Sequence, residues 1–382
     1  MRIAFIDLGT LDYDADTPLR QPLGGTESAL CYLAVELARV GHQVSVFNNT
    51  SHPGEVRNVV FRNRRDADFS CAVDSHDAAI VIGCADALAL RRAGISIALV
   101  MWTGHLCEFG TVQALARPDE VAEWRAFAFV SEWQREGYLR RFAIDPARTT
   151  VLRNAVAPSF EAIEPCRPWF ETGDSPTLVY TSTPFRGLAV LLHAFARIRT
   201  AIPETRLRLF SGMATYQAAE QDAAFAGIYR QANAMAGVEC VGPVSQNRLA
   251  NEICAAAALA YPSIYPETSC ISVLEAMRCG CAILTTRLGA LPETAGSFGR
   301  YVEMPSHARD LVEQYAAMVV EALHAMRADP ASSAQQRAAQ IRHVQEHYTW
   351  AVRASEWTAW LEQLLGNTID SPAGAATPSL IA

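Results

Sequence analysis

The sequence predicts an α/β protein made of two doubly wound domains, and three observations support this. A chain of 382 residues that is 50% hydrophobic is too long for one ordinary core and suits two domains of ~150–200 residues each. Short apolar runs alternate with amphipathic stretches, as in parallel strands connected by helices. A proline-rich segment near the middle of the chain interrupts this alternation.

The first domain is expected over residues 1–160. Its apolar runs are continuous, which is typical of strands covered by helices on both faces. An amphipathic stretch over 27–40 predicts one of the connecting helices. The predicted strands are Ile3–Asp7, Val44–Phe47, Ala79–Ile82, Ile97–Trp102, Phe127–Val130 and Thr150–Leu152.

The alternation stops between Pro158 and Pro176, where four prolines and a glycine accumulate, and we place an interdomain linker at 161–176. It resumes over 177–345, which predicts a second domain of the same class. The strands expected there are Leu178–Thr181, Leu207–Phe210, Val238–Val241, Ala258–Tyr261 and Ala282–Thr285. Residues 332–365 suggest two further helices, and residues 366–382 lack the apolar density to pack and are predicted to be disordered.

Composition restricts the class of partner. The net charge of −8 disfavours nucleic acid, and the chain contains no lysine, so a phosphate-binding cation must be arginine or histidine. The ten cysteines show no zinc-site spacing and predict buried thiols in a reducing cytoplasm. No run is long enough for a membrane span, and none resembles a signal peptide.

The most informative segment runs from Tyr265 to Gly280 and carries Glu267 and Glu275. It leads from a strand end into a helix that begins near Ser272, so the amides of 269–272 would form an anion site facing the crevice. Ser272-x-x-Glu275 is also the pattern of a capping box, and this structural alternative stays open for Glu275. Glu267 lies in the loop and has no capping role.

This segment, followed by Gly289-Ala-Leu-Pro-Glu293, resembles the signature of retaining GT-B glycosyltransferases of glycosyltransferase family 4 (glycosyl transferases group 1). The resemblance covers most of the chain. It extends to Gly24-Gly25-Thr26-Glu27, Trp102-Thr-Gly-His105, the segment around Asn154, Thr181 to Leu188 and Val241 to Ser245.

The resemblance implies a GT-B fold, in which two Rossmann-like domains face a central crevice. The donor would lie mostly on the second domain and the acceptor mostly on the first. A terminal helix over 346–365, carrying Trp350, Trp357 and Trp360, would pack back on the first domain. The resemblance assigns catalytic roles to Glu267, His105 and Arg186, and contacts on the acceptor side to His105 and Trp102. The residues that it implies in contact with the donor are Gly24, Gly25, Ser182, Arg186, Glu267, Ser269, Cys270, Ile271 and Glu275.

In these roles Glu275 would hold the donor ribose, Glu267 the transferred sugar and Arg186 the diphosphate. No cofactor is implied beyond the nucleotide-sugar substrate, and no metal. One of the family's two phosphate-binding cations is missing here, with Ser182 near its position. Thr268 and Cys270 replace an aromatic residue and a glycine that are common in the family.

The expected function is a retaining hexosyltransferase that moves a sugar, from UDP by preference, to a hydroxyl of a carbohydrate or small molecule in glycoconjugate or polysaccharide assembly. The alternatives are an epimerase or phosphorylase on the same fold, or a non-catalytic nucleotide-sugar-binding protein. An oxidoreductase is least favoured because no GxGxxG follows the first strand.

The expected location is the cytoplasm. Weak peripheral contact with the inner membrane face, made by the arginine-bearing helix over 131–142, is left open. A solvated surface is the preferred interpretation of that helix. Asp7, Glu27 and Glu293 have both structural and functional interpretations, and the oligomeric state is left open.

Overall fold

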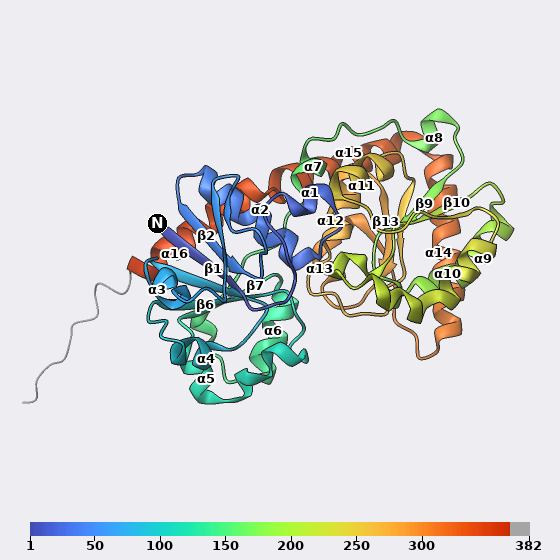
Figure 1. The fold of residues 1–382 in the computed structure, drawn as a ribbon. Coiled ribbons are helices and arrows are strands. Elements are labelled where there is room, and N and C mark those ends of the chain that lie inside the picture. The colour runs from blue at the N-terminus through green and yellow to red at the C-terminus, as the bar shows by residue number, and fades with distance from the viewer. Residues whose placement is uncertain (367–382) are drawn as a thin grey trace, which may run out of the picture.

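The computed structural model describes residues 1–366 and contains two mainly parallel sheets that lie side by side (Figure 1). The first sheet has the order β3-β4-β2-β1-β5-β6-β7-β8, with only the β3–β4 pair antiparallel. Its strands are β1 (Arg2–Asp7), β2 (Gln43–Asn48), β3 (Gly54–Val56), β4 (Val59–Asn63), β5 (Ala78–Ile82), β6 (Ala98–Thr103), β7 (Ala126–Phe129) and β8 (Thr149–Val151).

The second sheet is fully parallel, with the order β11-β10-β9-β12-β13-β14. Its strands are β9 (Thr177–Tyr180), β10 (Arg206–Leu209), β11 (Val238–Cys240), β12 (Ala258–Tyr261), β13 (Ala282–Thr286) and β14 (Gly299–Val302). In each sheet the strand order reverses near the first strand of that sheet, which is the place where doubly wound sheets bind ligands.

Helices connect the strands. In the first domain they are α1 (Thr17–Arg20), α2 (Gly25–Arg39), α3 (Phe69–Asp74), α4 (Ala87–Arg92), α5 (Pro118–Glu123) and α6 (Glu132–Arg141). In the second they are α9 (Leu188–Ala201), α10 (Ala226–Ala234), α11 (Gln246–Ile253), α12 (Ile271–Cys279), α13 (Leu291–Ala295) and α14 (Ala308–Ala328).

The fold class that the sequence predicted is confirmed. Both faces of the first sheet are buried, since Ile3 and Phe5 of β1 belong to one apolar cluster and Ala4 and Ile6 to another. This burial explains why its strands are continuous apolar runs. The sequence did not predict β3, β4 or β14. β3 and β14 are short edge strands with exposed or polar residues, and β4, which lies between β3 and β2, has only three apolar residues before Arg62 and Asn63.

The segment between the sheets contains two one-turn helices, α7 (Pro158–Glu161) and α8 (Trp169–Thr172). Cys166, between them, forms a disulfide with Cys254 at the end of α11. The expectation that the cysteines are buried thiols is therefore wrong for this pair, and also for Cys71, which is a free but exposed thiol. Their Cα atoms are 5.7 Å apart, a normal disulfide separation that tertiary folding creates across 88 residues.

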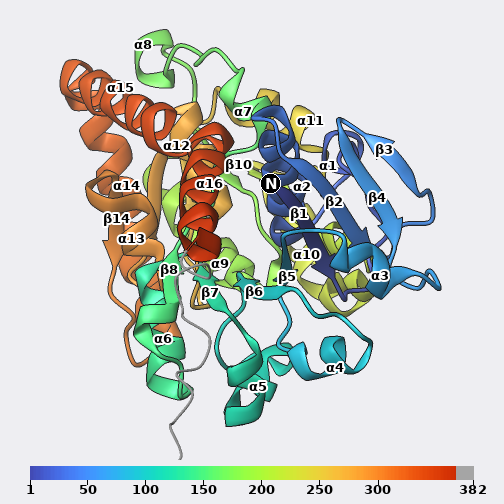
Figure 2. The ribbon, with the colours of Figure 1, turned by 90° about the vertical axis from the view of Figure 1, so that its left-hand side faces the viewer.

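The chain then returns to the first domain. α15 (Pro330–His347) lies on α12, and α16 (Trp350–Gly366) packs against α2 (Figure 2). Trp357 of α16 meets Trp102 of β6 edge-on, with ring centroids 5.3 Å apart. The predicted disordered tail begins at Gly366, and its residues 367–382 lie outside the described part of the chain.

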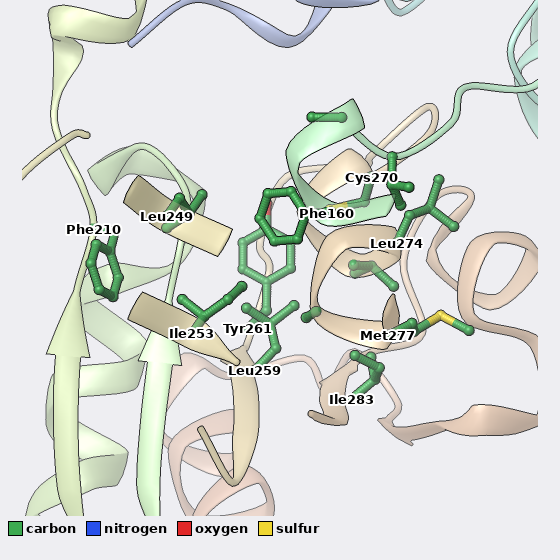
Figure 3. Close-up of a cluster of buried hydrophobic side chains, with 14 of the residues drawn as sticks. Phe160, Phe210, Leu249, Ile253, Leu259, Tyr261, Cys270, Leu274, Met277 and Ile283 are labelled. Carbon is green, nitrogen blue, oxygen red and sulfur yellow. The ribbon is translucent and has the colours of Figure 1, made fainter. Parts of the chain in front are cut away.

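One apolar cluster supports the second-domain side of the crevice. Figure 3 shows side chains of α7, α11, α12, β12 and β13 gathered together, among them Phe160, Leu274 and Tyr261. The Tyr261 ring is part of this cluster, while its hydroxyl reaches a buried carboxylate on the neighbouring loop. The core thus fixes a polar group at the crevice.

Candidate active site

A cavity of about 540 Å³ lies between the two sheets. Its walls are the carboxyl ends of strands and the loops that follow them, together with the amino ends of α2 and α12. The structure brings every candidate site residue to this one cavity. They are Gly24, Gly25, Trp102, His105, Ser182, Arg186, Glu267, Ser269, Cys270, Ile271 and Glu275.

The amino end of α12 faces the cavity without a side-chain cap. Cys270 is the N-cap residue and makes no side-chain capping hydrogen bond. In the first turn the Val273 amide donates to the Cys270 carbonyl oxygen at 3.1 Å, whereas the amides of Ile271 and Ser272 precede any carbonyl of the helix that could accept from them. The Ser272 hydroxyl instead donates to the Thr181 carbonyl oxygen at 2.8 Å. The capping-box alternative for Ser272 and Glu275 is therefore wrong, because the N-cap is Cys270, two residues before Ser272, and the Ser272 hydroxyl bonds Thr181 instead of a helix amide.

Glu275 is an uncompensated buried carboxyl group. It lines the cavity, is only 2% exposed, and its Oε1 has no hydrogen-bond partner. Burial raises its pKa to about 8, because a charged carboxylate loses its hydration there. A native structure retains such a group at a cost, which favours a functional explanation in which ligand hydroxyls donate to it.

Arg186, in the turn after β9, forms a bidentate ion pair with Glu267. Its Nη1 lies 2.8 and 2.9 Å from the two carboxylate oxygens, and its guanidinium stacks 4.7 Å from the Tyr265 ring centroid. Burial alone would lower the pKa of Arg186, but the Glu267 charge outweighs it and holds that pKa above its ordinary value. Its Nε is buried and unpartnered, so the cation keeps a free donor.

The loop that carries Glu267 is held by close backbone packing. The Glu267 carboxylate also accepts a hydrogen bond from the Tyr261 hydroxyl, and its carbonyl oxygen accepts one from the Ala290 amide at 2.7 Å. Gly289 has φ +60°, and a Cβ there would lie 2.5 Å from the Glu267 carbonyl oxygen. Only glycine allows this approach.

The first-domain wall carries a second carboxyl group. Glu27, in the first turn of α2, lines the cavity, and a Cβ on Gly24 would lie 2.4 Å from its Oε2. Burial and the charge of Asp7 raise the pKa of Glu27 to about 7. Asp7 itself is buried, accepting hydrogen bonds from the Tyr13 hydroxyl and the Gly9 amide at 2.7 Å each.

His105 follows β6 and stacks on Phe109, with ring centroids 4.4 Å apart. Burial lowers its pKa, so the imidazole is neutral at pH 7. Trp102, also on this wall, lies at the end of β6, where it packs on α16.

Several contacts join the two domains across the cavity. Gln217 exchanges hydrogen bonds with both backbone groups of Asp12, at 2.8 and 3.1 Å, and the Thr268 hydroxyl donates to the Gly104 carbonyl oxygen at 2.6 Å. Tyr216 places its hydroxyl 3.4 Å from Arg186 Nη2 and its ring beside Gly24. Sequence reasoning missed Tyr216 and Gln217, because their turn after β10 has no periodicity or motif.

Glu293 has a structural explanation. From α13 it accepts hydrogen bonds from the amides of Glu132 and Trp133, at the start of α6, and pairs with Arg153 at 3.0 Å. It thus stabilises the amino end of a first-domain helix from the second domain.

Two further findings concern the described residues 1–366. No group of three or more His, Cys, Asp or Glu side chains there is placed to hold a metal ion. None of the helices combines the length and the apolar character that crossing a membrane requires.

Comparison with known proteins gives a family match over part of the chain. Residues 175–324 match the family model described as Glycosyl transferases group 1. Over 242 residues, 58% of this chain, the sequence is 28% identical to alpha-maltose-1-phosphate synthase of Mycolicibacterium smegmatis. The match spans 59% of that relative's length.

Solved structures share the fold over nearly the whole chain. Sucrose-phosphate synthase of Thermosynechococcus elongatus has a TM-score of 0.71 at 17% identity, covering 96% of this chain and 100% of its own. Anabaena HepE in complex with UDP and glucose has a TM-score of 0.67 at 15% identity, covering 95% of this chain and 100% of its own.

The fold is that of GT-B glycosyltransferases, with two Rossmann-like domains that face a crevice. Residues 175–324 match glycosyl transferases group 1, and the resemblance seen in the sequence is confirmed over this part of the chain.

Proposed function

We propose that this protein is a retaining glycosyltransferase that moves a hexose from a nucleoside diphosphate, UDP by preference, to an acceptor hydroxyl. One observation carries the proposal: a partnerless buried carboxyl group, a buried arginine and an uncapped helix amino end converge on one cavity. The UDP complexes of the Anabaena structure, which has the same fold, support the choice of nucleotide.

Each group matches one part of such a donor. Ribose hydroxyls would donate to Glu275, whose Oε1 has no protein partner. The diphosphate would lie against the first-turn amides of α12, Ser182 and Arg186, which together replace the family's second cation. Glu267, already ordered by Arg186 and Tyr261, would accept from hydroxyls of the sugar.

Bond cleavage at the anomeric carbon produces an oxocarbenium-like sugar and a dianionic leaving group. Arg186 and the amides of α12 would stabilise the departing charge, and they need no reorganisation because the structure already holds them in place. The acceptor would attack from the leaving group's own side, with a phosphate oxygen taking its proton and His105 positioned beside the sugar. No metal is required, and the expected setting is glycoconjugate or polysaccharide assembly in the cytoplasm.

The test measures UDP affinity by calorimetry and donor consumption for UDP-, GDP-, ADP- and dTDP-glucose without metal. Arg186→Gln should lower the turnover of the preferred donor about a hundredfold, since losing one preorganised donor to a leaving group costs about 3 kcal/mol. The control is Arg309→Gln, which changes an arginine whose side chain is 83% exposed on α14. Equal turnover in both variants, or no binding of any nucleotide sugar, would refute the proposal.

A further inference from the structure

The two walls of the cavity differ in charge. The second-domain wall contains Arg186, the one arginine among the described residues that line the cavity. That guanidinium is bound to Glu267 through Nη1 and keeps an unpartnered Nε, and the proposed function assigns it to the diphosphate. A second anionic group in the same cavity would therefore need a cation from elsewhere.

The first-domain wall instead presents negative charge. The Glu27 carboxyl group lines it, and Asp7 lies behind Glu27 closely enough to raise its pKa. No arginine is among the groups that perturb the pKa of Glu27 or His105, the titratable side chains of this wall. A phosphate placed here would be repelled by two carboxylates, at an energy that low-dielectric walls increase.

The remaining polar groups on this wall are uncharged. Asn154 is 8% exposed and lines the cavity, and its side-chain amide has no hydrogen-bond partner among residues 1–366. The Thr26 hydroxyl and the neutral His105 ring lie on the same wall. A nearly buried amide with unused donors and acceptors, beside a hydroxyl and a carboxylate, matches the hydroxyl groups of a sugar or polyol.

We propose that the acceptor is an uncharged polyhydroxylated molecule, such as a free sugar, and that Glu27 with Asp7 behind it excludes phosphorylated acceptors. Glu27 and Asn154 then act as specificity-determining residues that hydrogen-bond acceptor hydroxyls. This inference rests on the proposed function and names the substrate class of its acceptor side. The names of several relatives contain a sugar phosphate, so it also separates this chain from them.

The experiment uses pairs of acceptors that differ only by a phosphate: glucose with glucose 6-phosphate, maltose with maltose 1-phosphate, and glycerol with glycerol 3-phosphate. UDP release from UDP-glucose is followed at pH 8, where Glu27 is mostly ionised. In the wild type the neutral member should have a kcat/KM at least about tenfold higher, the effect of one nearby like charge at effective dielectric ~20.

Glu27→Gln keeps the shape of the side chain and removes its charge, so it should reduce that preference several-fold. Glu346→Gln, at a 66% exposed side chain on α15, should leave it unchanged. A phosphate ester that is the better acceptor in its pair would overturn the inference, as would a panel in which no neutral member raises UDP release. If UDP-glucose neither binds nor turns over, the proposed function fails and this inference fails with it.

Discussion

The two glutamates of the loop before α12 and of α12 itself have opposite environments. Glu267 is 4% exposed but accepts hydrogen bonds from Arg186 and Tyr261, so its charge is compensated. Glu275 is equally buried and has an oxygen without a partner. The same residue type therefore fills two roles, one as part of a preorganised ion pair and one as an unsatisfied acceptor that a ligand would complete.

At the scale of this single residue, Glu275→Gln should stabilise the protein in alkaline solution. The folded pKa of about 8 lies above the ordinary value of 4.5, so the folded state holds a proton that the unfolded state has lost. The resulting stability is present below pH 4.5 and declines as pH rises through 8. Glutamine removes the buried charge, a gain on the order of 2 kcal/mol at pH 9.

Thermal unfolding of wild type and Glu275→Gln at pH 5 and pH 9 measures this change in stability. The difference in Tm between Glu275→Gln and wild type should be larger at pH 9 than at pH 5. UDP should also bind the variant more weakly, because an amide cannot accept hydrogen bonds from both ribose hydroxyls as a carboxylate does. A Tm difference that is the same at both pH values would show that the carboxyl group does not titrate in this range.

At the scale of the element, the β13–α13 turn positions the Glu267 loop. Gly289→Ala would place a Cβ within 2.6 Å of the Glu267 backbone, so the loop must move and the Arg186–Glu267 pair must loosen. Gly296→Ala is a matched control, because its φ of +54° is almost the same as the +60° of Gly289 while nothing lies within 4 Å of its Cβ. Both substitutions place a Cβ on a backbone with positive φ, which costs at least about 1–2 kcal/mol.

Donor turnover and denaturant midpoints of the two variants separate these effects. Both midpoints should fall, but only Gly289→Ala should also lower UDP-glucose turnover at saturating donor, by roughly tenfold or more, because misplacing a catalytic group by about 1 Å has a large effect on rate. Equal losses of turnover would mean that the turn does not control the position of Glu267.

At the scale of the whole molecule, the chain joins its domains by returning across the crevice. α16 completes the core of the first domain, with Trp357 1% exposed against Trp102 and His42 donating to or accepting from Thr358 at 2.8 Å. Glu293, Thr268 and Gln217 add polar contacts between the domains. The first domain therefore depends on residues that follow the second in sequence.

Trp357→Ala should consequently destabilise the first domain by about 3–5 kcal/mol, the usual cost of removing a fully buried tryptophan. Trp360→Ala, at a half-buried position on the same helix, serves as the comparison and should cost clearly less. Hydrogen exchange measured by mass spectrometry should show faster exchange in β1, β5 and β6 for Trp357→Ala, with β9 and β12 little changed. Equal acceleration in both sheets would indicate that the domains unfold together.

Local sequence was sufficient for the architecture. Doubly buried strands appear as continuous apolar runs, and the loop–helix segment from Tyr265 to Gly280 carries its two glutamates within one short stretch, so a linear pattern contains both signals. The resemblance to a known family named eleven residues that line the cavity before any contact was known, but it did not name Tyr216, which lines the cavity as well. The exposed edge strands β3 and β14 were missed for the same physical reason, since they lack that apolar signal.

Contacts between distant residues were decided only by the tertiary structure. The Arg186–Glu267 pair joins residues 81 apart, and the Cys166–Cys254 disulfide joins residues 88 apart. Whether Ser272 caps a helix or bonds Thr181 depended on where the helix begins, which neighbouring elements determine. Propensity and periodicity describe one segment of the chain at a time. The charge state of Glu275 and Glu27 depends instead on the groups that folding places around them.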